Sequence, residues 1–277
     1  MSSSPAVVFG AGVGSGIIAL LALQFLRRYG SKSIAEEVKK RNWQIGDKQK
    51  VPYSDKIHCL DPVKIGEIPG ALYGLMISSV VPRPIALVSS QDASGVLNCS
   101  PYSYFNMMCH DPPIICIGCC VGRGKKKDTL NNIQETGQFV VNIMSDWYVE
   151  SANHCCGNFP PEVNEIDISG LTTAASTVVK APRIQEAAIS LECEVLELKP
   201  AYNAANEHAV TVVMAKIVKF HIQDHVLVPG SLENQKPLVD ARKLAPICRL
   251  GGNTYGTVGE MFDLPRPSNE NLYRKVP

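Results

Sequence analysis

The chain has 277 residues, of which 45% are hydrophobic and 19% are charged, and its formal net charge is +1. This length suits one large domain with appendages, and the apolar content is enough to fill its core. A net charge so close to zero argues against a protein that binds nucleic acid through a basic surface.

Residues 1–26 carry no charged side chain and are almost wholly apolar from Pro5 onward. That is about the length needed to cross a bilayer. Lysines and arginines follow from Arg27, and positive charge accumulates on the cytoplasmic side of membrane proteins. The pattern predicts a transmembrane anchor over 1–26, a polar linker over 27–60 and a domain over 61–277 that faces the cytosol. A short, glycine-rich helix with a basic flank suits the endoplasmic reticulum or the mitochondrial outer membrane.

Other interpretations of this segment stay open, chiefly a soluble helix or a buried hairpin. Residues 7–16 also look like a strand entering the glycine loop of a dinucleotide-binding turn, but no second strand with an acidic residue follows. A cleaved signal peptide would begin with basic residues, and a transit peptide would be rich in arginine. The uncharged start fits neither.

From Gly70 onward, short β-rich runs alternate with turn residues, which is typical of a sandwich or barrel. The predicted strands cover residues 85–89, 114–117, 139–143, 189–198, 209–220 and 225–228. Two helices are predicted over 128–134 and 146–153, and Gly137 is a good stop signal for the first. Since helices are few and no βαβ rhythm is visible, the pattern predicts a mainly β fold, a barrel with peripheral helices.

Ten cysteines are spread along the chain, several of them inside apolar runs such as residues 112–119. An unpaired cysteine behaves as a small hydrophobe there, and disulfide scaffolds are usually short secreted chains. We therefore expect reduced cysteines. Cys116 and Cys119 form a C-x-x-C pair, but on a strand they point to opposite faces, so we expect no metal site.

An ordered series of motifs carries a family resemblance. Residues 81–90 read VPRPIALVSS, residues 98–106 read NCSPYSYFN, and residues 127–129 read KDT, with ETGQFVVN following at 135–142. Further pieces of the series are found at 111–113, 159–161, 169–171, 181–183, 191–193, 249–252 and 255. The series resembles the flavin reductase-like, FMN-binding split-barrel family, in the branch that includes nitrilotriacetate monooxygenase component B. The resemblance covers roughly Gly70 to Pro267.

The resemblance implies an FMN-binding split barrel that uses NADH or NADPH as co-substrate. It implies a homodimer with the flavin at the subunit interface. The implied cofactor contacts come from two segments, which supply Asn98, Ser100, Pro101, Tyr102, Ser103, Tyr104 and Asn106, and Lys127, Asp128 and Thr129.

Elementary chemistry agrees with the phosphate end of this assignment. Lys127 and Thr129 offer a cation and a hydroxyl at a helix start, where backbone N–H groups already favour an anion. Asp128 is expected to cap that helix. In one extended strand, Ser100, Tyr102 and Tyr104 would share a face, so only part of the ring segment would reach the flavin.

His208 is the candidate catalytic residue. Residues 206–208, Asn-Glu-His, resemble a Gly-Asp-His element near the nicotinamide side of the flavin, although the first two residues differ. The alternative is an exposed turn histidine.

The function expected is therefore a membrane-tethered, NAD(P)H-dependent flavin reductase, supplying a flavin-dependent partner enzyme, in which the cofactor carries the hydride chemistry. Two other functions stay open: a non-catalytic FMN-binding module, and a flavin-dependent oxidase or oxygenase with its own organic substrate.

Overall fold

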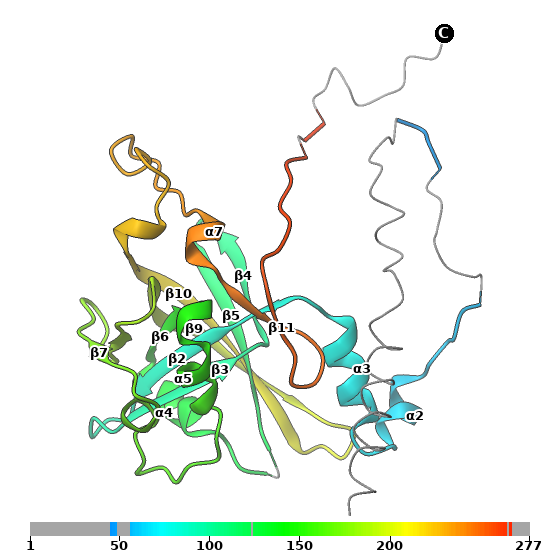
Figure 1. Ribbon diagram of the computed structural model, residues 1–277. Coiled ribbons are helices and arrows are strands. Elements are labelled where there is room, and N and C mark those ends of the chain that lie inside the picture. Colours follow the sequence, from blue (N-terminus) through cyan, green and yellow to red (C-terminus); the bar gives the residue numbers. More distant parts are fainter. Residues whose placement is uncertain (1–44, 49–55, 123, 265, 268–277) are drawn as a thin grey trace, which may run out of the picture. The chain divides into compact units, whose positions relative to one another are not determined.

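The computed structural model describes residues 45–48, 56–122, 124–264 and 266–267. Leu60–Phe262 form a compact unit of their own, shown with its elements in Figure 1.

The predicted membrane location is contradicted. Within the part of the chain that the structure describes, no helix is long and apolar enough to cross a bilayer. A single-pass location in the endoplasmic reticulum or the mitochondrial outer membrane is therefore not supported. The segment on which that prediction was based, residues 1–26, lies outside the described residues.

The body of the compact unit is a seven-stranded antiparallel sheet with the order β3-β2-β6-β9-β10-β5-β4 (Figure 1). Its strands are β2 (Ala86–Gln91), β3 (Leu97–Tyr102), β4 (Phe105–His110), β5 (Pro113–Cys120), β6 (Gln138–Ile143), β9 (Ile189–Tyr202) and β10 (His208–Ile222). The two edge strands, β3 and β4, are consecutive in the chain and are joined only by Ser103 and Tyr104. The sheet therefore curls until its two edges meet at this connection, while β3 and β4 form no ladder with each other.

Short elements surround this barrel. The helices are α2 (Pro62–Gly66), α3 (Ala71–Ser79), α4 (Asp128–Thr136), α5 (Val149–His154), α6 (Glu165–Ser169) and α7 (Ala241–Leu244), with 3-10 turns η2 (Asp146–Tyr148) and η3 (Asp224–Val226). A three-stranded sheet contains β1 (Arg83–Pro84), β11 (Ile247–Arg249) and β12 (Tyr255–Thr257), and a two-stranded one contains β7 (Thr173–Ala174) and β8 (Arg183–Ile184).

Strand β2 shows how the apolar pattern builds two cores. Ala86 and Val88 belong to the core that Phe139 and the inner residues of β5 share. Leu87, between them, belongs to a second core with Met144 and residues of α5 and α6. Because side chains alternate across a strand, β2 is buried on both faces, which explains why Ala86, Leu87 and Val88 are apolar in succession.

Most predicted elements are confirmed. Strands β2, β5, β6, β9 and β10 lie where the pattern placed them, and α4 ends at Gly137, which has a φ of 69°. The predicted helix over 146–153 is present as η2 followed by α5. The predicted strand over 225–228 is wrong. Its residues enter a local turn, in which Leu227 N–H donates to the Asp224 carbonyl at 3.0 Å.

Asn142 on β6 is a buried hydrogen-bond hub. Its side-chain nitrogen donates to the Leu87 carbonyl at 3.0 Å and to the Ser89 hydroxyl at 3.1 Å. Its side-chain oxygen accepts from Ile184 N–H at 2.9 Å and from the Ser190 hydroxyl at 2.8 Å. One amide thus connects β2, β8 and β9 to β6.

We expect Asn142→Ala to lower the free energy of unfolding by about 2 kcal/mol, because buried donors and acceptors then lose their partner. Urea denaturation measures this change. The matched control is Asn131→Ala, on an exposed position of α4, where a change within about 0.5 kcal/mol is expected. Equal effects of the two substitutions would contradict the prediction.

Candidate functional site

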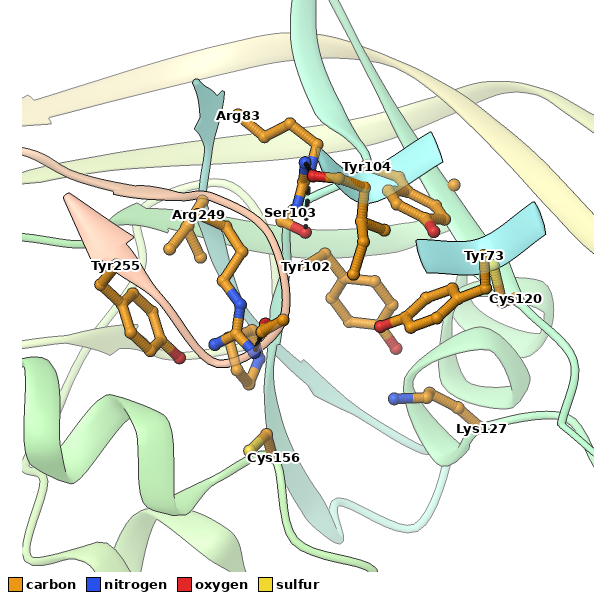
Figure 2. A pocket seen from close by; sticks show the side chains of 15 residues that line it. Tyr73, Arg83, Tyr102, Ser103, Tyr104, Cys120, Lys127, Cys156, Arg249 and Tyr255 are labelled. Atoms are coloured by element: carbon orange, nitrogen blue, oxygen red, sulfur yellow. Dashed lines mark hydrogen bonds between the residues drawn. The ribbon is translucent and has the colours of Figure 1, made fainter. Parts of the chain in front are cut away.

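A cleft of about 260 Å³ lies where the β3–β4 connection meets α3, β5, the start of α4 and the β11–β12 sheet. Its volume is close to the lower end of the range of small-molecule and cofactor sites, roughly 300–1,000 Å³. Figure 2 shows the side chains that line it, which include Tyr73, Arg83, Tyr102, Tyr104, Lys127, Arg249 and Tyr255. Segments far apart in the sequence, from residue 73 to residue 255, therefore form its wall.

The connection between β3 and β4 places four consecutive residues, Pro101 to Tyr104, on the cleft. The expected single strand over 100–106, with alternate residues facing opposite ways, is wrong because the chain bends at Ser103 and Tyr104. Gly118 N–H on β5 donates to the Tyr104 carbonyl at 2.7 Å. A side chain at Gly118 would bring its Cβ within 3.1 Å of Tyr104 Cβ. Glycine thus permits the close approach that holds the bend.

Tyr102 forms the buried floor of the cleft. Its side chain is 5% exposed, and its hydroxyl has no hydrogen-bond partner within the described residues. Burial raises the pKa of Tyr102 far above its ordinary range, so the phenol stays neutral and keeps its proton. The Lys127 Nζ lies over the ring, 5.6 Å from its centroid.

Lys127 is the residue from which α4 starts. Its carbonyl accepts from Leu130 N–H at 2.9 Å and from Asn131 N–H at 3.1 Å. The expected cap by Asp128 is wrong, since Lys127 is the N-cap and Asp128 is the first helical residue. The first amides of a helix have no partner within it, so the ammonium of Lys127 and these amides lie at the same end of α4.

Asn98 and Thr129 belong to a buried network behind the cleft. The Thr129 hydroxyl donates to Asn98 Oδ1 at 2.6 Å, and Asn98 Nδ2 donates to Glu165 Oε1 at 2.8 Å. Glu165 also accepts from Cys99 N–H at 3.0 Å. The network joins α4, β3 and α6, so these two residues fix the position of Lys127 and of the ring segment without lining the cleft.

The other predicted cofactor residues also lie off the cleft lining. Ser100 is buried on β3 beside Tyr102, and Asn106 on β4 is exposed, its side-chain oxygen accepting from Met107 N–H at 2.8 Å. Of the ten residues predicted to bind the cofactor, the cleft is lined by Pro101, Tyr102, Ser103, Tyr104 and Lys127. The roles of all ten remain predictions.

Arg83 was not singled out by the sequence, yet it organises the cleft. Its guanidinium donates to the carbonyls of Ile77 at 2.6 Å, Val80 at 2.7 Å and Leu250 at 2.8 Å. It also donates to the Ser103 hydroxyl at 3.4 Å, and both side chains are labelled in Figure 2. Only 7% of the residue is exposed. It ties α3, the bend and the loop after β11 into one wall, and its position in the opening motif at 81–90 was the only available signal.

Arg249 and Tyr255 line the cleft from the small sheet. The Arg249 guanidinium lies over the Tyr255 ring, 4.4 Å from its centroid, and donates to the Gly252 carbonyl at 2.9 Å. The Tyr255 hydroxyl donates to Asn153 Oδ1 at 2.6 Å. Burial raises the pKa of Tyr255, and the neighbouring Arg249 offsets only part of that rise.

His208 lies away from this cleft, at the start of β10. Its Nε2 is 2.9 Å from the Thr211 hydroxyl, and its ring packs against Tyr202 with 5.8 Å between centroids. It borders a different cavity, with Lys126 and Glu207. The structure therefore does not bring His208 together with the ring segment, and its catalytic role stays a prediction.

Comparisons with known proteins agree on the fold and the family. A family profile described as "Flavin reductase like domain" matches residues 77–244. An uncharacterised protein of Halalkalibacterium halodurans is 38% identical over 199 residues, covering 71% of this chain and 91% of the relative. The crystal structure of nitrilotriacetate monooxygenase component B from Bacillus cereus is 34% identical with a TM-score of 0.70, covering 76% of this chain and all of that chain.

A Pseudomonas fluorescens 2-nitrobenzoate 2-nitroreductase is 31% identical, with a TM-score of 0.62, over 74% of this chain and 94% of that chain. A protein from Shewanella frigidimarina with a split-barrel domain, at 19% identity and a TM-score of 0.64, shares the fold. The resemblance seen in the motifs is confirmed, and the chain belongs to the flavin reductase-like domain family.

Proposed function

We propose that the protein binds FMN in the cleft and is reduced there by NADH or NADPH. The observation that carries this proposal is the arrangement of Pro101–Tyr104 and Lys127, which line one cleft although they come from different elements, the β3–β4 connection and the start of α4. The family membership supports a flavin as the ligand. The cation at the start of α4 supports a phosphate-bearing flavin, and the resemblance of the motifs to FMN-binding split barrels favours FMN.

The phosphate end of FMN fits the residues around Lys127. A phosphate needs a cation and N–H donors, and the ammonium of Lys127 and the first amides of α4 meet both needs. No carboxylate is among the described residues that line the cleft, so nothing there repels an anion. Thr129 contributes indirectly, because its hydroxyl donates to Asn98.

The ring end fits the bend and the tyrosines. Isoalloxazine is flat and polar at its edges, and the cleft combines aromatic side chains with backbone groups of an irregular segment. The buried Tyr102 hydroxyl is a neutral donor without a partner within the described residues, and buried polar groups normally have one. Such a group is expected beside a polar ligand.

FMN supplies the hydride chemistry when it is bound, and the chain supplies position and charge. Arg83 fixes the bend by bonding Ser103 and the carbonyls of the neighbouring wall. Cys120 adds no negative charge, because burial raises the pKa of its thiol, although Lys127 offsets part of the rise. The cleft thus keeps the positive charge that would favour reduced, anionic flavin.

We also propose a homodimer. Helix α3 is apolar, yet only Ile77 in it is buried, while Tyr73 and Met76 are 63% and 53% exposed. Because Tyr73 also lines the cleft, a second copy packed on α3 would close it.

The relative named component B of a monooxygenase supports a further proposal, that the reduced flavin serves a flavin-dependent partner enzyme.

The test is to titrate the purified full chain with FMN and follow quenching of flavin fluorescence. We expect stoichiometric binding, then loss of the oxidised flavin absorption on adding NADH or NADPH without air. A chain that binds no FMN would refute the proposal. Bound FMN that neither nucleotide reduces would instead favour a non-catalytic binding module.

A further inference from the structure

The charges along the cleft exceed what FMN binding at Lys127 requires. Its lining contains Arg83, Lys127 and Arg249, and no carboxylate belongs to the described lining residues. Arginine is protonated at any physiological pH. Burial raises the pKa of Tyr104 and of Tyr255, so the phenols do not compensate this charge. If the FMN phosphate binds at Lys127, the charges of Arg83 and Arg249 still need an explanation.

Arg83 is explained by the fold. Three backbone carbonyls accept from its guanidinium, and it is almost completely buried. Arg249 is different. One of its nitrogens donates to a single carbonyl, Gly252, and no ion pair with a carboxylate is found for it within the described residues. Several of its N–H groups therefore remain available to a ligand.

Two contacts also restrict the orientation of the Arg249 guanidinium, which favours the binding of an anion. Its guanidinium rests on the Tyr255 ring, which is itself fixed by the bond to Asn153. Stacking on an aromatic ring and a bond to one carbonyl restrict the planar fork, so less freedom is lost when it grips a second anion. A guanidinium binds carboxylate or phosphate oxygens in pairs, which a lysine cannot do.

Arg249 reaches the cleft from an element different from those expected to hold FMN. It comes from β11, whereas Lys127 starts α4 and the ring segment joins β3 to β4. In Figure 2 the ends of Arg249 and Lys127 extend into the cleft from separate parts of its wall. FMN has one strongly anionic group, its phosphate, and that group is assigned to Lys127.

We infer that Arg249, supported by Tyr255, is a second anion subsite that anchors a carboxylate or phosphate oxygen of the ligand that reacts with the flavin. This inference rests on the proposed function for the neighbouring flavin. Tyr73 and Tyr104 are 63% and 41% exposed, so flat aromatic faces line the same cleft as the subsite. The ligand class is a planar ring compound carrying an anionic oxygen group.

The anionic oxygen group could belong to an aromatic carboxylate or to a nucleotide phosphate. Benzoate is the probe for the first class of ligand, and NADH and NADPH are the probes for the second. Binding of each to the full chain is measured by calorimetry, with and without FMN. We expect Arg249→Gln to weaken one class of probe at least 10-fold while the FMN affinity stays within about twofold of wild type. Arg249→Lys keeps the charge without the fork and should lose about threefold.

The matched control is Arg242→Gln, which removes the same charge from an exposed position of α7 outside the cleft and should leave all affinities unchanged. A thermal melt checks that each variant is folded. If Arg249→Gln disturbs the fold, the Arg249→Lys comparison decides.

The inference is overturned if wild type and Arg249→Gln bind every probe within twofold of each other, or if wild type binds none. It is also overturned if FMN affinity falls in Arg249→Gln as far as in a Lys127 variant, because Arg249 then belongs to the flavin. A wild-type chain that binds no FMN refutes the proposed function instead. In that case probe binding to the flavin-free protein still reports on Arg249.

Discussion

Lys127→Gln is expected to weaken FMN binding by about 100-fold. The change removes a charge-assisted contact to phosphate, which contributes roughly 2–3 kcal/mol in a partly enclosed site, and each 1.4 kcal/mol is about tenfold in affinity. Equilibrium titration of flavin fluorescence measures the dissociation constant. The loss should shrink at high salt, because added ions screen the attraction in the wild type.

The preceding residue in the chain provides a matched control. Lys126 carries the same charge, but its Nζ donates to Gln134 at 2.8 Å, and it lies outside the cleft. Lys126→Gln should change FMN affinity by less than about threefold, which is the scale of a distant, screened charge. Equal losses in the two variants would mean that the basic run acts only through its overall charge, and the assignment of the phosphate to Lys127 would be abandoned.

The sequence was sufficient to predict the barrel because its strands carry the signal locally. The apolar runs at β2, β6 and β9 are bounded by turn residues, and α4 ends at a glycine in the left-handed region. The strand predicted at 225–228 failed because a short apolar run does not show whether neighbouring strands offer it a ladder. At Asp224 the backbone bonds to itself instead.

The site was predictable only in part, because its geometry depends on contacts between distant segments. Residues 101–104 and Lys127 were found through the motifs, but the bend that turns four consecutive residues toward the cleft depends on Gly118 in another strand. Asn98 and Thr129 are predicted to contact the cofactor, a role that stays a prediction, and in the structure their side chains bond to each other. No local signal shows such a pairing.

Arg83 and Arg249 also show that the role of a residue depends on contacts with distant segments. Arg83 has a structural role, and Arg249 is a candidate binding residue. Both are arginines inside motifs, and nothing nearby in the sequence distinguishes them. The structure shows that three backbone carbonyls from two segments hold Arg83, whereas Arg249 lines the cleft and donates to one carbonyl, that of Gly252. Structural and binding roles therefore separate only when the partners from elsewhere in the chain are known.

Glu192 is a buried carboxylate outside the cleft, on β9. It is 0% exposed, and its two oxygens accept from the N–H groups of Thr177, Val178 and Val179, at 2.6–2.8 Å, and from His221 Nε2. Burial raises the pKa of Glu192, but the bonds from His221 and the three amides outweigh it and lower the pKa to about 2. The carboxylate thereby holds the 177–179 loop on the sheet.

Glu192→Gln is expected to lower the free energy of unfolding at neutral pH by about 3–4 kcal/mol, the scale of breaking a buried, hydrogen-bonded charge. Each carboxylate oxygen of Glu192 accepts from two donors. The NH2 group of a glutamine at this position would therefore face donors in either orientation of its amide. Urea denaturation measures the loss. The matched control is Glu194→Gln, two residues along β9 at an exposed position, which should change stability by less than about 0.5 kcal/mol.

The pH dependence of this difference identifies its cause. The folded pKa of Glu192, about 2, lies below its ordinary value of 4.5, so the folded state binds the proton more weakly than the unfolded state. The stabilisation is therefore complete above about pH 4.5 and disappears as the pH falls toward about 2. The gap between wild type and Glu192→Gln should narrow over that window, since protonated Glu192 is no longer an anion. A gap that keeps its neutral-pH size down to about pH 3 would show that packing, and not the charge, makes Glu192 stabilising.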